Sequence, residues 1–465
     1  MKIFTAKKKF DLKLTLLTIA FFITTTFLFS LYNIDFSPLI LVIILAIYLK
    51  YFYRQKNLPS YLDLLLLVSF AILIVLLTTV IFNKLFPLSI PAIGFIILVT
   101  ILFDNLQLSF LFSIFLSTLA ASVLKGNMGL LVGASLLSAS LMAALLSYRV
   151  RTRSKIIKAV LYAGIVQFCV AFIVKRSQAL YSLPFSDIDL IKGCSFSIVF
   201  SSIVIAFLPV FEYVFRVVTN ISLLELSDFN HPLLKRMILE APGTYQHSLV
   251  VANLAESASE AIGANPLLAR VGAYYHDIGK IPKAHYFVEN QIPYRDVHKD
   301  LKPSISKLII INHVKEGIEL AKKYRLNPKI VDFIAQHHGK SLVYYFYQRA
   351  KEMEPLSEHE EEYRYPGPRP QSKEIATVSL ADTIEALSRT LEEPTPSRIE
   401  EMVKDLVRKK FIEGELDESD LTLKDLEKIA ESFVRILNAI FHTRINYPQN
   451  GANKKSSKSQ ENKSK

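Results

Sequence analysis

The sequence predicts an all-α protein in two parts: a polytopic bundle of transmembrane helices, followed by an all-helical soluble domain. Three observations predict this fold class. Hydrophobic residues make up 51% of the 465 residues, and the mean hydropathy is positive at +0.31. The apolar residues are concentrated before about residue 218. After about residue 220, apolar positions recur at helical spacing and strand-like alternation is scarce.

The first part, residues 1–218, consists of apolar blocks of roughly 16 to 23 residues separated by short polar breaks, and a helix of that length can cross a bilayer. We expect about eight such helices. The first block is long and continuous, which indicates a retained span rather than a cleaved signal segment. The expected spans are about 14–32, 36–53, 61–83, 88–103, 106–124, 128–147, 156–174 and 194–216.

The placement of Lys and Arg predicts the orientation of these spans. The breaks "KKKFDLK", "KYFYRQK" and "YRVRTRSK" fall on one side when eight spans are threaded. Basic loops stay in the cytoplasm, so both termini are expected there. We therefore expect a multi-pass protein of the inner (cytoplasmic) membrane of a cell, with its soluble domain in the cytoplasm.

The net charge of +12 does not point to a nucleic acid polymer. Much of the charge lies in loops beside apolar spans and in the C-terminal tail, a pattern typical of contact with anionic lipid headgroups. The expected partner is therefore the lipid bilayer, and the sequence also allows a homo-oligomer. Residues 448–465 have no apolar pattern and are expected to form a disordered basic tail.

The soluble domain is expected to span residues 219–447. "TYQHSLVVANLAESASEAIG" predicts a helix that ends at Gly263, and "NPLLARVGAYYHDIGK" predicts one that ends at Gly279. Further helices are expected at "NHVKEGIELAKKYRLNP", at "NPKIVDFIAQHHG", which closes on Gly339, and at "SKEIATVSLADTIEALSR", the last helix. The acidic and then proline-rich segment "EMEPLSEHEEEYRYPGPRPQ" predicts a long loop that acts as a lid or tether.

All 10 histidines follow residue 230, and imidazole is a frequent ligand of transition metals. Several of them recur with aspartates in the order H…HD…H…HH…D on successive predicted helices. Two divalent ions about 3.5–4 Å apart need several nitrogen ligands and a bridging carboxylate, so this order predicts a hydrolytic metal centre. The candidate ligands are His247 mid-helix, His276 and Asp277 at a helix end, His313 at a helix start, His337 and His338 at another helix end, and Asp382 inside the last helix.

A family resemblance rests on the strings "PGTYQHSLVVANLAE", "AYYHDIGK", "HVKEGIELA", "QHHG", "YRYPGPRPQSKE" and "LADTIEAL". They resemble the HD-domain phosphohydrolases, and most closely the bacterial seven-transmembrane HD family of PgpH type, whose members degrade cyclic di-AMP. The resemblance covers about residues 36–447 and implies a metal-dependent phosphodiesterase that hydrolyses cyclic di-AMP to linear pApA. Members commonly carry an extracellular domain after the first span. Only about "YNID" follows Leu31 here, so such a domain is expected to be missing.

The resemblance also implies a role for each candidate ligand. It implies that two divalent ions, usually iron or manganese, are bound by His247, His276, Asp277 and Asp382, and by Asp277, His313, His337 and His338, with Asp277 bridging. The nitrogen and oxygen donors alone agree with iron, manganese or zinc. Lys280 is expected to offset charge on phosphoryl oxygens, or to act only as a cation at a helix end. His298 is expected to contact the substrate, or to be a solvated loop residue.

Two other functions remain open on the sequence. The same ligands would serve a phosphohydrolase that acts on another nucleotide, either a polyphosphate or a monophosphate. A non-catalytic membrane receptor with a structural metal site is the second alternative. The sequence alone separates neither from a cyclic dinucleotide phosphodiesterase.

Overall fold

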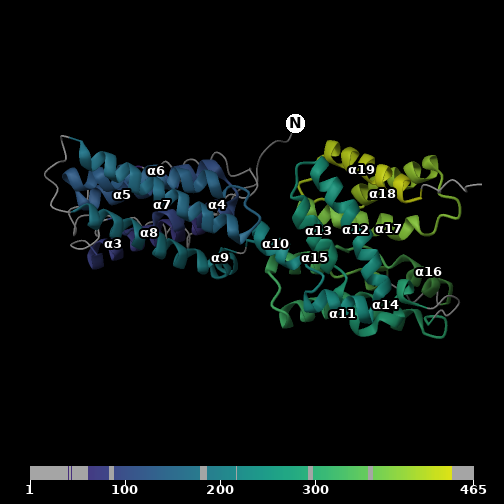
Figure 1. The fold of residues 1–465 in the computed structure, drawn as a ribbon. Coiled ribbons are helices and arrows are strands. Elements are labelled where there is room, and N and C mark those ends of the chain that lie inside the picture. Colours follow the sequence, from purple (N-terminus) through teal and green to yellow (C-terminus); the bar gives the residue numbers. More distant parts are fainter. Residues whose placement is uncertain are drawn as a thin grey trace, which may run out of the picture. The chain divides into compact units, whose positions relative to one another are not determined.

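The structure is a computed structural model that describes residues 61–82, 88–177, 186–215, 217–291, 297–353 and 360–441, together with Ile40 and Ile43. The predicted span at 14–32 and the predicted tail at 448–465 lie outside these residues, as does nearly all of the span at 36–53. The described residues form helices and no strand, with one isolated bridge between Leu342 and Arg364. The predicted all-α class is therefore confirmed (Figure 1).

The chain divides into two compact units. The first unit comprises Met1–Lys235 and Glu319–Asp332, and the second unit comprises Arg236–Ile318 and Phe333–Lys465. The boundary after residue 218 stays a prediction.

The first unit contains the apolar helices. Four described helices, α5 to α8, are long and apolar enough to cross a membrane. Helix α4 is about 18 Å long, which is shorter than the hydrocarbon core of a bilayer. All of its residues are buried. It contacts each of α5, α6, α7 and α8. The helices are α3 Tyr61–Phe82, α4 Ala92–Phe103, α5 Leu106–Leu124, α6 Gly126–Ser147, α7 Arg153–Arg176, α8 Asp187–Ala206, α9 Leu208–Phe215 and α10 Asn220–Leu226.

The last apolar segment differs from the prediction of one span at 194–216. Helix α8 begins at Asp187 because Ser186 and Asp189 form a capping box, in which each side chain binds the other residue's main-chain N–H. The chain then breaks at Phe207, and α9 follows. Pro209 lacks an N–H and cannot continue the hydrogen-bond ladder of α8. The predicted single helix is therefore two.

The second unit is built around α12, which contacts α13, α17 and α19 (Figure 1). Gly263 follows the end of α12 and Gly339 follows the end of α15, and both have a positive φ, as predicted for residues that end helices. The elements after α10 are α11 Pro232–Glu240, α12 Pro242–Ala261, α13 Pro266–Tyr275, η2 Ile278–Tyr286, η3 Val288–Asn290, α14 Pro303–Lys323, α15 Pro328–Gln336, α16 Tyr344–Met353, η4 Glu360–Tyr363, α17 Lys373–Ser388, α18 Pro396–Ile412 and α19 Leu423–Phe441.

The prediction that a helix ends at Gly279 is wrong. Helix α13 already ends at Tyr275, and Gly279 lies in the 3-10 helix η2. A Cβ atom at Gly279 would lie 1.8 Å from the carbonyl oxygen of His313 and 2.5 Å from the amide nitrogen of Gly317. Gly279 is thus required by the close approach of α14, and not by a helix terminus.

Two further helix positions need correction. His313 lies in the middle of α14, because this helix begins at Pro303 and not at the histidine. Proline is favoured at the first helical position, where its missing N–H has no partner to lose. Asp382 lies inside α17 as predicted, but α17 is not the last helix, since α18 and α19 follow.

Candidate metal centre

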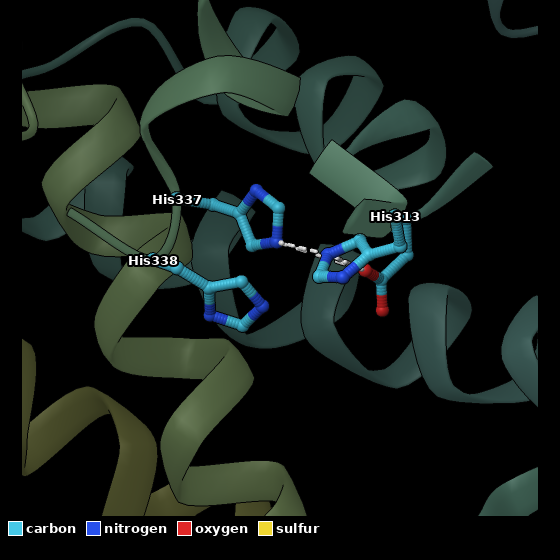
Figure 2. A group of neighbouring side chains, drawn as sticks. His313, His337 and His338 are labelled. Atoms are coloured by element: carbon cyan, nitrogen blue, oxygen red, sulfur yellow. Dashed lines mark hydrogen bonds and ion pairs between the residues drawn. The ribbon is translucent and has the colours of Figure 1, made fainter. Parts of the chain in front are cut away.

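Five separate segments of the second unit bring the candidate ligands together. His247 comes from α12, and His276 and Asp277 lie where α13 ends and η2 begins. His313 comes from α14, the pair His337 and His338 follows α15, and Asp382 comes from α17. In Figure 2, the rings of His337 and His338 point toward His313, and the Nε2 atoms of His313 and His337 are 3.4 Å apart.

The seven side chains form two groups that share one residue. In each group, one donor atom per residue lies within 4.8 Å of all the others. The groups are His247, His276, Asp277 and Asp382, and Asp277, His313, His337 and His338. These are the two sets that the family resemblance implies. Six of the seven side chains are buried, and His338 is partly exposed.

Asp277 directs one carboxylate oxygen at each group. Its Oδ1 lies 3.3 Å from Nε2 of His313 and 3.6 Å from Nε2 of His337. Its Oδ2 lies 3.3 Å from Nε2 of His276 and 3.7 Å from Nε2 of His247. This is the arrangement that a carboxylate bridging two ions requires.

Main-chain carbonyls orient three of the histidine rings. Each of these rings lies with Nδ1 against a carbonyl oxygen three residues earlier, which places an N–H on Nδ1 and directs Nε2 away from that carbonyl. These pairs are His276 with Ala273 (2.7 Å), His313 with Ile310 (2.5 Å) and His337 with Ile334 (3.0 Å). Nε2 of each ring therefore points to the centre, where it can bind a cation in the neutral form of the ring.

A carboxylate orients the fourth ring. Nδ1 of His247 lies 2.5 Å from Oε2 of Glu385, whose other oxygen accepts a hydrogen bond of 2.5 Å from Nε of Arg389. Sequence reasoning missed Glu385. Its spacing of three residues from Asp382 was an available signal, because residues three apart share a helix face.

The site contains buried polar atoms that a cation would satisfy. Nε2 of His276 and Oδ1 of Asp277 are buried and have no hydrogen-bond partner within the described part of the chain. Burying a polar atom without a partner costs free energy, and a carboxylate costs more than a neutral group. A donor set of imidazole nitrogens and carboxylate oxygens therefore fits divalent transition metals.

The electrostatics favour the metal-binding protonation states of several ligands. Burial alone would raise the pKa of Asp277, but Lys280 and His276 outweigh it and hold the pKa well below its usual range. Burial lowers the pKa of His337. Burial and electrostatic repulsion from the neighbouring His337 lower the pKa of His338 well below its usual value. Ionised carboxylates and neutral imidazoles are the forms that bind metal.

Lys280 lies against the shared carboxylate. Its Nζ is 2.7 Å from Oδ2 of Asp277 and 2.9 Å from Oε1 of Glu289. Burial works to lower the pKa of Lys280, but these carboxylates hold it well above its usual value. Lys280 is therefore a buried cation beside the two groups of candidate ligands, and not a solvated cation at a helix end.

His298 is also buried, contrary to the alternative of a solvated loop residue. One ring nitrogen lies 3.0 Å from Oγ of Ser306 and the other 2.8 Å from the carbonyl oxygen of Tyr286. Both nitrogens are thus occupied within the fold, although the residue lines the same cavity as the metal-binding groups. Contact with substrate stays a prediction for His298.

The two groups open into one cavity of about 1100 Å³. This volume is slightly larger than the usual range for small-molecule sites, about 300–1,000 Å³. The ring of Tyr365 stacks on His338 at 4.2 Å between centroids and adds an aromatic wall. Tyr365 belongs to the predicted loop "YRYPGPRPQ", so part of that loop lies over the site.

Comparison with known proteins assigns both halves of the chain to families. A family model described as "HD domain" matches residues 244–387. A second, described as "7TM receptor with intracellular HD hydrolase", matches residues 36–219.

Two curated relatives bear the name cyclic-di-AMP phosphodiesterase PgpH. The protein from Bacillus subtilis is 43% identical over 300 residues, which cover 64% of this chain and 42% of the relative. The protein from Listeria monocytogenes is 45% identical over 241 residues, which cover 52% of this chain and 33% of the relative. The chain thus spans less than half the length of either relative.

A solved structure matches the second half. It is the crystal structure of the Listeria monocytogenes PgpH HD domain in complex with cyclic-di-AMP, and the two sequences are 44% identical. The match covers 46% of this chain and 100% of the crystallised chain, with a TM-score of 0.45. The two family models match in sequence order, one on the apolar half and one on the histidine-rich half. The chain is a membrane protein, and it belongs to the family of 7TM receptors with an intracellular HD hydrolase domain.

Proposed function

We propose that the chain is a membrane-anchored, metal-dependent phosphodiesterase that hydrolyses cyclic di-AMP to the linear dinucleotide pApA. The observation that carries the proposal is the placement of Asp277 between two groups of metal-binding side chains. The names of the two PgpH relatives support the choice of cyclic di-AMP. We further propose, from the distribution of Lys and Arg, that the site faces the cytoplasm from the inner membrane.

Hydrolysis adds one water across one phosphodiester. A bond forms between the water oxygen and phosphorus, and the bond from phosphorus to the 3′ oxygen breaks. The 3′ oxygen takes up a proton, so the product is linear and keeps a 5′ phosphate. Two divalent ions, when bound, would lower the pKa of water and offset charge on the phosphoryl oxygens. Iron or manganese is proposed, and the nitrogen and oxygen donors suit both.

The chain's own residues would prepare the site for this reaction. Asp277 presents one oxygen to each group, so it would fix the spacing of the ions. Lys280 keeps that carboxylate ionised and adds positive charge beside it, where negative charge develops on the phosphoryl group. Tyr365 offers an aromatic wall on which a nucleobase can stack.

The test uses the full chain in detergent micelles, with manganese or ferrous iron and cyclic di-AMP. We expect pApA as the product, identified by chromatography, and no product from the double variant His276→Ala, Asp277→Ala. A panel of other cyclic dinucleotides, nucleotide polyphosphates and monophosphates defines the preference. Turnover of polyphosphates or monophosphates without any cyclic dinucleotide would support another phosphohydrolase. No turnover in any arm would support the receptor alternative.

A further inference from the structure

A second buried lysine lies in the wall of the cavity that contains the metal-binding groups. Lys410 belongs to α18 and is only 9% exposed. Its position lies beyond the residues matched by the HD family model, which end at 387. It lines the same cavity as His338 and Asp382, yet it takes no part in either metal-binding group.

The charge of Lys410 is not balanced as that of Lys280 is. Lys280 pairs with two carboxylates, whereas Lys410 forms no ion pair within the described part of the chain. Its Nζ donates one hydrogen bond, of 2.6 Å, to Oγ of Ser341. An ammonium has three N–H donors, so Ser341 satisfies only part of its capacity.

Glu415, the carboxylate with the largest electrostatic effect on Lys410, does not fill this gap. Oε2 of Glu415 accepts the main-chain N–H of Lys340 at 2.9 Å, so this carboxylate is directed at the backbone. Burial lowers the pKa of Lys410, although Glu415 and Glu413 act against the shift. A buried ammonium with one hydroxyl acceptor is costly, and an anion that enters the cavity would offset this cost.

Hydrogen bonds link Lys410 to the part of the cavity next to the metal-binding groups. The N–H of Ser341 donates to the carbonyl oxygen of His338 at 3.0 Å. The carbonyl oxygen of Ser341 accepts the N–H of Tyr365, also at 3.0 Å. Ser341 therefore positions the ammonium beside one metal-binding histidine and the aromatic ring stacked on it.

We propose that Lys410 binds the second phosphodiester of a cyclic dinucleotide, the one that is not being cleaved. The inference rests on the proposed function and adds a determinant of substrate specificity to it. A cyclic dinucleotide carries two anionic phosphodiesters. The metal-binding groups would take one, and the other needs a cation elsewhere in the same low-dielectric cavity. Lysine serves such a position as a compact point charge on a flexible stem.

The test compares two substrates on the full chain. Cyclic di-AMP has both phosphodiesters, whereas bis(p-nitrophenyl) phosphate has only one. Lys410→Met, of similar size and without charge, is expected to raise KM for cyclic di-AMP by about 10- to 100-fold with little change in kcat. Activity toward bis(p-nitrophenyl) phosphate should stay unchanged, and Lys410→Arg should recover most of the loss.

Two further variants control for position and folding. Lys409→Met removes the charge next along the chain, where the side chain is 66% exposed and lies 3.9 Å from Glu413, and should leave both substrates unaffected. Ser341→Ala removes only the acceptor of Nζ and should raise KM for cyclic di-AMP about threefold, which tests the position even if Lys410→Met does not fold.

An equal loss on both substrates, or no loss on either, would overturn the role of Lys410. If the wild-type chain cleaves bis(p-nitrophenyl) phosphate but no cyclic dinucleotide, the proposed function itself is refuted, and the inference with it. If the wild-type chain hydrolyses cyclic di-AMP and the Lys410→Met variant does so with the same KM, only the role of Lys410 is refuted and the proposed function stands.

Discussion

Nζ of Lys280 lies 2.7 Å from Oδ2 of Asp277, the carboxylate that both groups of candidate metal ligands share. Glu289 contacts the same ammonium on its other side. Lys280 and His276 together hold the pKa of the Asp277 carboxyl well below its usual range, so Asp277 is ionised inside the protein. The consequences of this pairing can be measured without knowledge of the metal's identity.

Lys280→Met removes this cation and should lower kcat for cyclic di-AMP by about 10²- to 10³-fold, the usual effect of losing one group that stabilises transition-state charge. Lys280→Arg, which keeps the charge, should lose less. Elemental analysis should find the metal content of both variants close to that of the wild type. A kcat within twofold of the wild type for Lys280→Met would refute a role for this cation in the reaction.

Glu385→Gln should weaken metal binding by about 10- to 100-fold, because Glu385 orients the ring of His247. Chelator-competition titrations measure this affinity. The matched variant is Arg389→Gln, because Arg389 contacts Glu385 and not His247. Its side chain is 48% exposed, so the loss of metal affinity should be smaller. Equal affinities of wild type and Glu385→Gln would contradict the orienting role.

Metal binding should strengthen as pH rises. In the ion-free protein, burial lowers the pKa of His247, but Asp382 and Glu385 outweigh it and raise the pKa to about 9. Burial also lowers the pKa of His276, but the negative charge of Asp277 is the largest of the effects that outweigh burial and raise this pKa to about 10. Protons on these rings compete with metal, so affinity should increase from pH 7 toward pH 9. Calorimetry in buffers of different ionisation enthalpy should detect proton release, and its absence would refute this pKa assignment.

The same raised pKa values predict how the ion-free fold responds to pH. The stabilisation that the charged rings of His247 and His276 provide is complete below their usual pKa of 6.5. It is lost as pH rises through about 9 to 10. The thermal midpoint of chelator-treated protein should fall over that range. A midpoint that rises there would contradict the sign.

Gly279→Ala should destabilise the second unit by about 3 kcal/mol, since the added Cβ meets the main chain of α14. Gly263→Ala is the control. It has a positive φ but open space around the added Cβ, so only a backbone cost of about 1 kcal/mol is expected. Thermal unfolding monitored by circular dichroism should rank the two variants in that order. The reverse ranking would show that α14 can move away from Gly279.

The sequence predicted which side chains lie together better than it predicted the elements that carry them. His247, His337 and His338 lie on or directly after helices, as the apolar spacing indicated. The histidine string predicts a helix that begins near His313, whereas α14 begins at Pro303, a residue favoured at the first helical position. The position of Gly279 could not be predicted, because glycine is favoured both at a helix end and where two distant segments approach closely.

Residues that act through three-dimensional placement were harder to find. Lys410 lies on an amphipathic helix rich in charge, where a lysine ordinarily faces solvent, and nothing local separates it from the exposed Lys409. The stacking of Tyr365 on His338 depends on how a loop folds back over the site. Glu385 could have been inferred from its helix spacing to Asp382, because that relation is local.

We propose that the second unit binds two divalent ions through a shared Asp277. Elemental analysis of the purified full chain, prepared without chelators and loaded with manganese or ferrous iron under anaerobic conditions, tests it most directly. We expect two ions per chain in the wild type, and a lower content in His313→Ala and Asp382→Ala, which each alter one group only. A metal-free wild-type chain, or a metal content that none of these substitutions changes, would contradict it.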